Sequence, residues 1–463
     1  MYMENLVYET KNGWESLTDS QKKEVFYFSK GYAKYLDNGK TERLACREAV
    51  RLAKENGFVD LEEKETLKSG DRVYMVNRDK SVYFAVIGKE DIEKGINFVI
   101  SHIDSPRIDL KQNPLYEDGE LALLKTHYYG GIKKYQWTAT PLSLIGVVAL
   151  ENGENVNISI GENDDEPIFY ISDLLIHLAT KQMQKKLHEG IEGEALNIII
   201  GSTPDEKSEK DKFRTTVLKL LNEKYGIKEE DFLSAELEAV PNFKARDIGL
   251  DRALIGAYGH DDRVCAYTSL MALLEEKEPQ KTAVCMFSDK EEIGSMGNTG
   301  MRSAFFEYAT ALLIEKTKGT YNELSLKRTF RNSDCLSSDV NAAFDPTYPE
   351  VNDRKNCAYL SRGVVITKYT GSRGKSGTSD ASAEFVAKIR RIFNEGNVVW
   401  QTAELGKVDE GGGGTIAQYV ANLDINVIDC GVPLLSMHAP VEVASKLDIY
   451  MAYKGYKAFY RNY

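Results

Sequence analysis

The sequence predicts an α/β protein in which the two ends of the chain build one sheet domain and a mainly β domain is inserted between them. The chain has 463 residues, more than one typical core accommodates. Strand-like apolar runs alternate with helical segments near the start and again after about residue 250. Between about residues 108 and 247 the pattern changes to alternating, turn-rich segments. We therefore expect an α/β domain from residues 1–107 and 248–463, and an inserted domain from residues 108–247.

The first elements are predicted from capping residues and apolar runs. Polar caps precede helical patterns over residues 22–35 and 41–54, and Gly57 is the expected stop of the second helix. Two apolar runs, residues 82–87 and 96–100, follow and predict core strands.

The inserted module and the second half of the chain are predicted in the same way. In the module, residues 142–150 read as a strand, and residues 172–187 and 209–224 as helices. Later strands are expected at residues 283–287, 309–314, 364–367 and 427–429, and later helices at residues 382–393 and 444–461.

Composition limits the classes of function. The chain carries 59 basic and 71 acidic residues, a net charge of −12, without a dense basic cluster, so nucleic acid is not an expected partner. No apolar run reaches the roughly 20 residues that span a bilayer, and the start lacks the pattern of a signal peptide. The six cysteines show no paired spacing and are expected to behave as small hydrophobic residues. We expect a cytoplasmic protein without a membrane partner.

The stretch richest in possible chemistry follows the strand expected at residues 283–287. Glu291 and Glu292 are neighbours there, so in an extended or turning backbone their side chains point in different directions. One carboxylate can then hold a cation while the other faces what that cation has activated. A solvated turn is the ordinary alternative for an isolated pair of this kind.

Further histidines and carboxylates occur where strands are predicted to end. The motifs are His102-Ile-Asp104, Gly259-His-Asp261-Asp262, Ser337-Ser-Asp339 and Leu435-Ser-Met-His438. Loops at strand ends meet on one edge of an α/β sheet, so these groups can converge. Imidazole and carboxylate both suit zinc, and carboxylates can bridge two ions about 3.5–4 Å apart. The chain lacks the Cys-x-x-Cys and His-Glu-x-x-His patterns of common mononuclear zinc sites.

The order and spacing of five motifs resemble the M18 family of metalloaminopeptidases, the group of aspartyl aminopeptidase and vacuolar aminopeptidase I. The motifs are His102-Ile-Asp-Ser-Pro106, Asp289-Lys-Glu-Glu-Ile-Gly-Ser295, Ser338-Asp-Val-Asn-Ala-Ala343, Gly413-Gly-Thr-Ile416 and Ser436-Met-His438. The resemblance extends over nearly the whole chain. It implies a zinc-exopeptidase-like, three-layer α/β/α catalytic domain with an inserted oligomerisation or lid domain. It also implies a dinuclear aminopeptidase that acts on peptides with a free N-terminus.

The resemblance implies a ligand for each expected position of two divalent metal ions. His102 and Asp339 would bind one ion, and Glu292 and His438 the other. The carboxylate that bridges the two ions would come from the Asp261-Asp262 pair; Asp261 matches the family's first acidic position, and the choice between the two stays open. Zinc is the expected metal, and cobalt and manganese accept the same ligands.

The neighbouring acidic residues receive supporting roles from the same resemblance. Asp104 would hydrogen-bond the His102 imidazole and fix its tautomer. Asp262 would be structural, and Glu291 would be the general base that takes a proton from water and delivers it to the departing amine.

His177 lies in the inserted module, where a histidine among Leu and Ile is ordinarily a packed helix residue. In the family the matching histidine reaches the active site of a neighbouring subunit and helps to hold the substrate carbonyl. The resemblance therefore implies a homo-oligomer, typically a dodecamer built from dimers.

The loops at residues 371–376 and 411–415 are candidates for substrate binding. The first has the outline of a phosphate loop, but Gly371 lies too close to Gly374 for a Walker A motif. In the family this segment borders the substrate pocket, so Arg373 or Lys375 would face the side chain being removed, and acidic and neutral preferences both remain open. Gly413 and Thr415, with the rest of the run at residues 411–414, could bring backbone N–H groups close to the substrate or to metal-bound oxygen, and a flexible tight turn is the equal alternative.

Two other functions are compatible with these motifs. A related dinuclear amide hydrolase, such as a carboxypeptidase or a deacylase, would use the same metal core. A catalytically silent assembly or cargo protein could be built on the same fold, although the intact set of ligands and Glu291 argues against it.

Overall fold

The computed structural model describes residues 6–461, which fold as two compact units. The first unit comprises the chain up to Asp104, Ala245–Met437 and the residues from Val441 onward. The second comprises Ser105–Lys244 and the short segment His438–Pro440. Each unit is built on its own main sheet.

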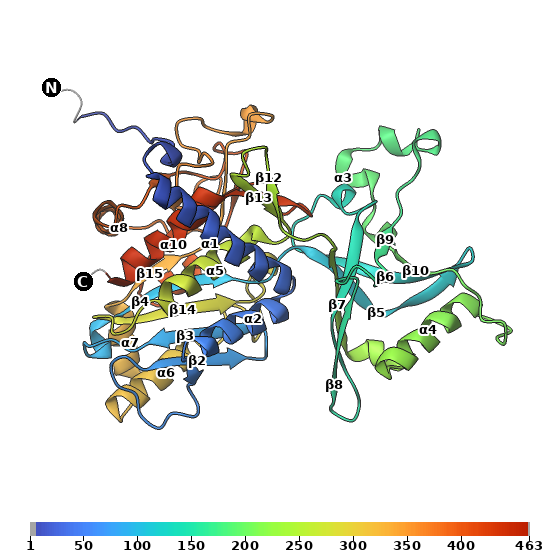
Figure 1. Cartoon of the computed structure of the whole chain (residues 1–463), viewed down its shortest axis with the longest axis horizontal. Coiled ribbons are helices and arrows are strands. Elements are labelled where there is room, and N and C mark those ends of the chain that lie inside the picture. The colour runs from blue at the N-terminus through green and yellow to red at the C-terminus, as the bar shows by residue number, and fades with distance from the viewer. Residues whose placement is uncertain (1–5, 462–463) are drawn as a thin grey trace. The chain divides into compact units, whose positions relative to one another are not determined.

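The first unit is built on a nine-stranded sheet (Figure 1). In spatial order its strands are β1 (Val59–Asp60), β2 (Arg72–Asn77), β3 (Ser81–Val86), β14 (Thr282–Ser288), β4 (Ile96–His102), β15 (Asp334–Ser337), β21 (Asn426–Gly431), β17 (Val364–Thr367) and β19 (Trp400–Thr402). Strands β14, β4, β15 and β21 run parallel, so their carboxyl ends lie at one edge. That edge is where open α/β sheets place their chemistry.

Helices cover both faces of this sheet. One face packs against α1 (Asp19–Asn38), α2 (Glu42–Glu55), α5 (His260–Leu274), α8 (Ala383–Glu395) and α10 (Lys446–Arg461), and the other against α6 (Phe305–Lys318), α7 (Glu323–Arg331) and α9 (Ala417–Ala421). Strand β14 illustrates the pattern: Cys285 and Phe287 belong to the first core, while Val284 and Met286 belong to the second. Successive side chains of a strand point to opposite faces, and burial on both faces explains why this run is continuously apolar.

Two smaller sheets complete the first unit. A five-stranded sheet contains, in order, β12 (Arg246–Ile248), β13 (Leu254–Ala257), β23 (Glu442–Ser445), β22 (Pro433–Leu435) and β16 (Asn341–Ala342). A two-stranded sheet pairs β18 (Gly371–Ser372) with β20 (Gly412–Gly413).

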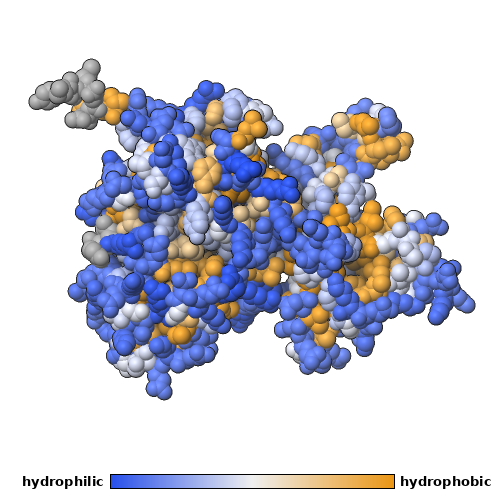
Figure 2. All heavy atoms as spheres, in the orientation of Figure 1, coloured by the Kyte–Doolittle hydropathy of each residue, from blue (hydrophilic) through white to orange (hydrophobic). Residues whose placement is uncertain are grey.

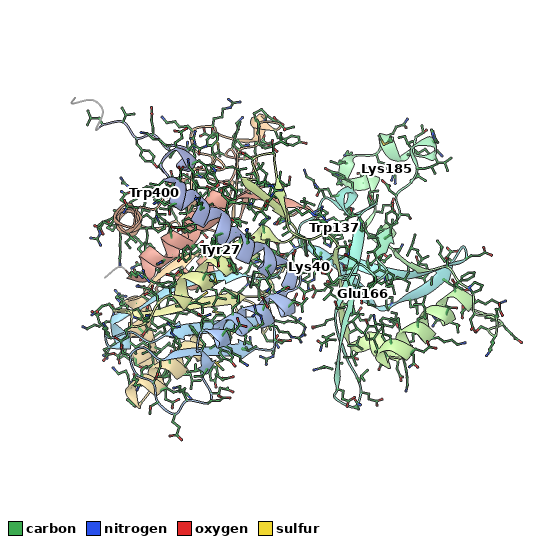
Figure 3. All side chains as sticks on the ribbon, viewed as in Figure 1. Tyr27, Lys40, Trp137, Glu166, Lys185 and Trp400 are labelled. Atoms are coloured by element: carbon green, nitrogen blue, oxygen red, sulfur yellow. The ribbon has the colours of Figure 1, made fainter. Side chains whose placement is uncertain are left out.

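The second unit is a seven-stranded antiparallel sheet. Its order is β11 (Ala235–Pro241), β5 (Arg107–Asp118), β6 (Leu121–Tyr129), β10 (Ile198–Gly201), β9 (Phe169–Ile171), β7 (Pro141–Ala149) and β8 (Asn155–Ile160), and β11 also pairs with β7, which closes the sheet on itself. Helix α4 (Lys212–Tyr225) packs against β6 and β10. Trp137 is fully buried in this unit (Figure 3).

Most of the expected elements are confirmed, and two are wrong. Residues 309–314 lie inside α6 instead of forming a strand. The buried residues of this helix, among them Phe305, Ala309 and Leu313, recur every four positions, the spacing of one helical face. The short run Ala-Leu-Leu-Ile masked that period.

The helix expected at residues 172–187 is also wrong. The structure has only the 3-10 turns η4 (Ile176–Leu178) and η5 (Gln182–Gln184), followed by α3 (Leu187–Gly190). Leu174, Leu175, Ile176, Leu178, Met183 and Leu187 are all exposed in the chain, and Figure 2 shows apolar surface on this unit. Three of these residues are consecutive, so they cannot share one helix face, and helices depend on such a packed face for most of their stability.

The six cysteines are all buried as free thiols, as expected from their apolar surroundings. Among residues 6–461, no helix combines the length and the apolar content that crossing a membrane requires.

Candidate metal centre

His102 is the last residue of β4 and lies at the carboxyl edge of the nine-stranded sheet. Its side chain is only 1% exposed. Its Nδ1 lies 3.0 Å from the carbonyl oxygen of Asp104 and 3.2 Å from the Asp104 carboxylate. Because acceptors surround Nδ1, the proton of a neutral ring stays on that atom, and Nε2 is left with a lone pair that can bind a cation.

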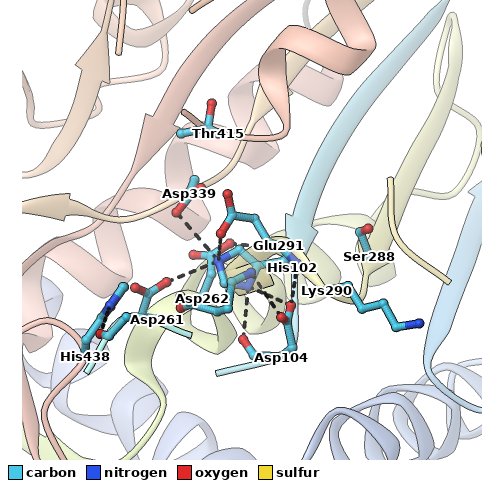
Figure 4. Close-up of polar contacts among 12 residues, drawn as sticks. His102, Asp104, Asp261, Asp262, Ser288, Lys290, Glu291, Asp339, Thr415 and His438 are labelled. Atoms are coloured by element: carbon cyan, nitrogen blue, oxygen red, sulfur yellow. Dashed lines mark hydrogen bonds and ion pairs between the residues drawn. The ribbon is translucent and has the colours of Figure 1, made fainter. Parts of the chain in front are cut away.

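Three carboxylates lie near His102 Nε2. Asp261 Oδ1 is 3.2 Å away, Asp339 Oδ1 3.8 Å and Glu291 Oε2 4.0 Å. In Figure 4 the dashed lines converge on the His102 ring. The predicted convergence of chain-distant residues is therefore present within the first unit.

Glu291 and Glu292 follow β14 in the 3-10 turn η8 (Glu291–Ile293). Lys290, which precedes the turn, has φ 64°, a conformation that non-glycine residues adopt rarely. The Asp104 carboxylate holds the turn: its two oxygens accept the backbone N–H groups of Glu291 at 3.1 Å and Glu292 at 3.2 Å. Asp104 thus fixes both the imidazole and the Glu-Glu turn.

Asp261 and Asp262 lie at the start of α5, in its first turn. The Asp261 backbone N–H donates to Glu442 Oε2 at 3.0 Å, and Asp262 Oδ2 accepts the His102 backbone N–H at 3.4 Å. Asp262 Oδ1 is buried and has no hydrogen-bond partner among the described residues. A buried carboxylate oxygen in this state suits a cation, because an uncompensated buried polar atom is costly.

Asp339 follows β15, two residues beyond the end of the strand. The neighbouring strand packs closely against it: a Cβ added to Gly431 would lie 1.7 Å from the Asp339 carbonyl oxygen. Only glycine leaves room for this approach.

Groups of potential ligand atoms occur within this cluster. One contains His102, Asp262 and Asp339, and another His102, Glu291 and Glu292, with the atoms of each group within 4.8 Å of one another. A buried imidazole surrounded by carboxylates is a donor set that suits zinc, so the residues fit a metal centre.

Several acidic side chains lie close together in the cluster, and burial and mutual repulsion raise their pKa values. Burial, followed by the charge of Asp339, raises the pKa of Asp262 well above its usual value. Burial also raises the pKa of Asp339, although His102 opposes this. For His102, burial favours the neutral ring, but Asp104 and Asp261 raise its pKa well above the usual value. A bound cation would relieve the repulsion between these acids.

His260 has a packing role beside the cluster. Its ring is fully buried, with Nδ1 2.6 Å from the hydroxyl of Tyr32 and Nε2 3.2 Å from the carbonyl of Ile255. Both nitrogens are therefore occupied, with Tyr32 as the donor and Ile255 as the acceptor. Burial lowers the pKa of His260 to about 3, so the ring stays neutral.

Two predicted histidines lie in the second unit. His438 begins the segment His438–Pro440, and its Nδ1 is 2.7 Å from the carbonyl oxygen of Gly131. His177 is exposed in the turn η4, so the packed-helix alternative is wrong for this chain. The roles of His438 as a ligand and of His177 in a neighbouring site stay predictions.

The candidate substrate residues lie on two paired loops. Arg373 and Lys375 line a cavity of about 410 Å³ together with residues of the segment 404–411. Lys375 pairs with Asp380 at 3.0 Å and lies 3.6 Å above the ring centre of Tyr369. Gly413 is exposed, whereas the Thr415 hydroxyl donates to Asp429 Oδ1 at 2.7 Å.

Sequence reasoning did not establish two features of the cluster. It left open whether Asp261 or Asp262 faces the ions, and the geometry places Asp262 in a group of possible ligands with His102 and Asp339. It also missed the contact between Asp104 and the Glu291-Glu292 turn. Adjacent acids were the only signal for the first feature, and no pattern in the sequence reveals the second.

The chain is similar in sequence and in structure to a family of metallopeptidases. Residues 35–460 match the family described as "Aminopeptidase I zinc metalloprotease (M18)". A probable M18 family aminopeptidase 1 of Clostridium acetobutylicum is 52% identical over an alignment of 463 residues, which covers 99% of this chain and 99% of that one. The crystal structure of an M18 family aminopeptidase from Thermotoga maritima matches with a TM-score of 0.95 and 45% identity, over 99% of this chain and 100% of that one. The S. cerevisiae mApe1 dodecamer shares the fold, with a TM-score of 0.76 at 18% identity over 94% of this chain and 96% of that one.

Proposed function

The chain belongs to the M18 family of zinc aminopeptidases, and from that premise we propose that it removes single residues from the free N-terminus of peptides with two metal ions held around His102. The observation that carries the proposal is the convergence of the buried His102 imidazole with carboxylates from the loops after β14 and β15 and from the start of α5.

The residues that would hold the ions divide into two sets. His102 and Asp339 would bind one ion, Glu292 and His438 the other, and Asp261 would bridge them. His438 is part of the connection between β22 and β23, and Glu442 at the start of β23 accepts the Asp261 backbone N–H. When bound, the ions would lower the pKa of water and polarise the scissile carbonyl.

Glu291 would act as the general base. Its Oε2 is 4.0 Å from His102 Nε2, and its side chain is 18% exposed, so it borders both the cluster and solvent. A base in this position can take a proton from the attacking water and deliver it to the leaving amine. Asp104 would support this step because it fixes the backbone N–H groups of Glu291 and Glu292.

Arg373 is the better candidate of the two basic residues for the substrate side chain. The charge of Lys375 is already engaged by Asp380 and lies over Tyr369. Arg373 lines the same cavity and forms no ion pair with the described residues. A free guanidinium would favour an acidic N-terminal residue, because Arg binds a carboxylate with two parallel hydrogen bonds.

The exposed apolar residues of the second unit support self-association. Leu175, Ile176 and Leu178 are 54%, 67% and 69% exposed, and they flank or include the turn that carries His177. Large exposed apolar patches commonly mark protein interfaces. A related yeast structure is a dodecamer, and we propose a homo-oligomer of this kind, in which His177 reaches a neighbouring active site.

Turnover of matched substrates tests the proposed activity. The metal-loaded protein should release nitroaniline from aminoacyl-nitroanilides with a free amino group and should not cleave N-blocked peptides. Cleavage of N-blocked peptides alone would favour a carboxypeptidase or deacylase. A metal-loaded protein that is inert on every unblocked peptide would favour the silent assembly protein.

A further inference from the structure

The glycine-rich loop at residues 411–414 is tied to its neighbour at its start. Gly412 and Gly413 pair with Ser372 and Gly371 in the sheet of β18 and β20. A Cβ added to Gly412 would lie 2.2 Å from the carbonyl oxygen of Gly371, so a larger residue does not fit there. By contrast, a Cβ added to Gly413 would meet no atom within 4 Å, so this part of the loop faces open space.

Thr415 ties the other end of the loop to the central sheet. Its hydroxyl donates to Asp429 Oδ1 at 2.7 Å, and its oxygen accepts the Ala417 backbone N–H at 3.3 Å, where α9 begins. The hydroxyl proton is therefore used within the protein and is not available to a substrate. Thr415 acts on the loop rather than on a ligand.

Asp429 is an unusual residue for the middle of the sheet. It lies within β21, is 3% exposed, and has Ser337 and Thr367 as its neighbours on the adjacent strands. Its Oδ2 has no hydrogen-bond partner among residues 6–461. Burial raises its pKa to about 6, although the neighbouring hydroxyls of Thr415 and Ser337 oppose the shift. A buried acid costs stability, and such groups are commonly functional.

The strand that carries Asp429 also supports the metal centre. Gly431, two residues further along β21, packs against the carbonyl of Asp339. In Figure 4, Asp339 lies between Thr415 and His102. One strand thus supports the proposed ligand Asp339 and, through Thr415, the end of the glycine-rich loop.

We propose that Asp429 is a positioning residue for the peptidase reaction, which through Thr415 holds the loop at residues 411–414 beside the metal centre so that its backbone receives the substrate. This inference rests on the proposed function. A loop that is already ordered does not have to be ordered when the substrate binds, so its anchoring affects substrate affinity first. Asp429 itself touches neither the proposed metal ions nor the substrate.

Substitutions of Thr415 separate the anchoring hydrogen bond from packing. Thr415→Val keeps the shape and removes the hydroxyl, whereas Thr415→Ser keeps the hydroxyl. We expect Thr415→Val to raise KM for an aminoacyl-nitroanilide by about 10-fold or more, because a hydrogen bond to a charged group is worth about 1.5–3 kcal/mol. Metal content should stay constant and kcat should change less than KM. Thr415→Ser should restore KM to within about 2-fold of the wild type.

Asp429→Asn tests the acceptor of the hydrogen bond from Thr415. The amide oxygen can still accept the Thr415 hydroxyl, but a bond to a neutral acceptor is weaker, so KM should rise less than in Thr415→Val. In the double variant KM should equal that of Thr415→Val alone, because Asp429 no longer reaches the loop once the hydroxyl is gone. Thr317→Val, which removes a hydroxyl bonded to the Leu313 carbonyl within α6, is the matched control.

Amide hydrogen exchange gives a measurement that does not depend on turnover. The amides of residues 411–414 should exchange faster in Thr415→Val than in the wild type or Thr415→Ser. Equal KM in Thr415→Val and Thr415→Ser, in an active enzyme, would overturn the inference alone. A lower Tm or metal content in Thr415→Val with unchanged KM would also overturn it. The hydrogen bond between Thr415 and Asp429 would then serve stability alone. A wild-type protein without aminopeptidase turnover would overturn the proposed function and this inference with it.

Discussion

Glu291 and its neighbour Glu292 illustrate how one backbone turn separates two roles. Both backbone N–H groups are fixed by the Asp104 carboxylate, which also lies 3.2 Å from the imidazole of His102. The orientation of the proposed base Glu291 and that of the proposed ligand His102 therefore depend on one buried acid. Such shared support is typical of sites that must hold their geometry before the substrate arrives.

Glu291→Gln should abolish turnover while leaving the metal bound. The amide keeps the size of the side chain but cannot take a proton, so kcat should fall about 10²–10⁴-fold. The check is kcat on an aminoacyl-nitroanilide together with metal content by elemental analysis. Retention of wild-type kcat would show that another group is the base.

Arg373→Gln should reduce the preference for acidic N-terminal residues. The variant loses the unpaired guanidinium of the cavity, whereas the matched control Lys375→Gln loses a charge that Asp380 already neutralises. We expect the ratio of kcat/KM for Asp- over Leu-nitroanilide to fall by about 10-fold in Arg373→Gln and by less in Lys375→Gln. Equal ratios in both variants and the wild type would remove Arg373 from the specificity pocket.

The acids and the imidazole of the cluster titrate, so the effect of bound metal on the stability of the fold should depend on pH. The pKa values of Asp262, Asp339 and His102 are all raised in the fold, and that of Asp289 nearby is raised from 3.8 to about 7 by burial and by Glu42. Groups with raised pKa bind protons more tightly when folded, so their contribution to stability is present at low pH and lost as pH rises through the folded-state pKa.

The metal-free protein should therefore lose stability as the pH rises, with the Asp289 contribution lost between about pH 4 and pH 7, and zinc should offset the loss that comes from its proposed ligands. Protons compete with zinc for the same ligands, so the rise in Tm on adding zinc should be larger at pH 8 than at pH 5.5. Thermal melts with and without zinc at the two pH values provide the measurement. A rise that is independent of pH would contradict this account of the cluster.

At the scale of elements, the sequence predicted best where burial determines the pattern. The strands at residues 82–87 and 283–287 are apolar on both faces because helices cover both sides of the sheet. The strand predicted at residues 309–314 and the helix predicted at residues 172–187 were wrong, because short runs of Leu and Ile show no clear periodicity. Only tertiary structure reveals whether such a run faces a core, as in α6, or lies exposed, as around His177.

The exposed apolar segment of the second unit should control assembly. The double variant Leu175→Asp, Ile176→Asp places charges on side chains that are 54% and 67% exposed in the single chain, so folding should be preserved while association is lost. Light scattering after size exclusion should show a shift from a large oligomer to smaller species. Leu220→Asp, at a residue of α4 that is 59% exposed, is the control and should assemble normally.

At the scale of the whole molecule, proposed ligands such as His102 and Asp339, more than 200 positions apart in sequence, meet because parallel strands end at one edge. The sequence predicted which residue types lie at those ends, and His102, Asp261 and Asp339 do converge. It could not tell whether Asp261 or Asp262 faces the ions, because adjacent carboxylates differ only in backbone direction. Nor could it place Asp429, whose role depends on contacts between distant strands and loops.

We propose that this edge of the sheet holds two catalytic ions, and their number can be measured in a zinc titration of the metal-free protein. Bound zinc per chain and turnover of an aminoacyl-nitroanilide are measured on the same samples. We expect two zinc ions per chain and activity that requires both. Full activity with one ion or fewer per chain would contradict it.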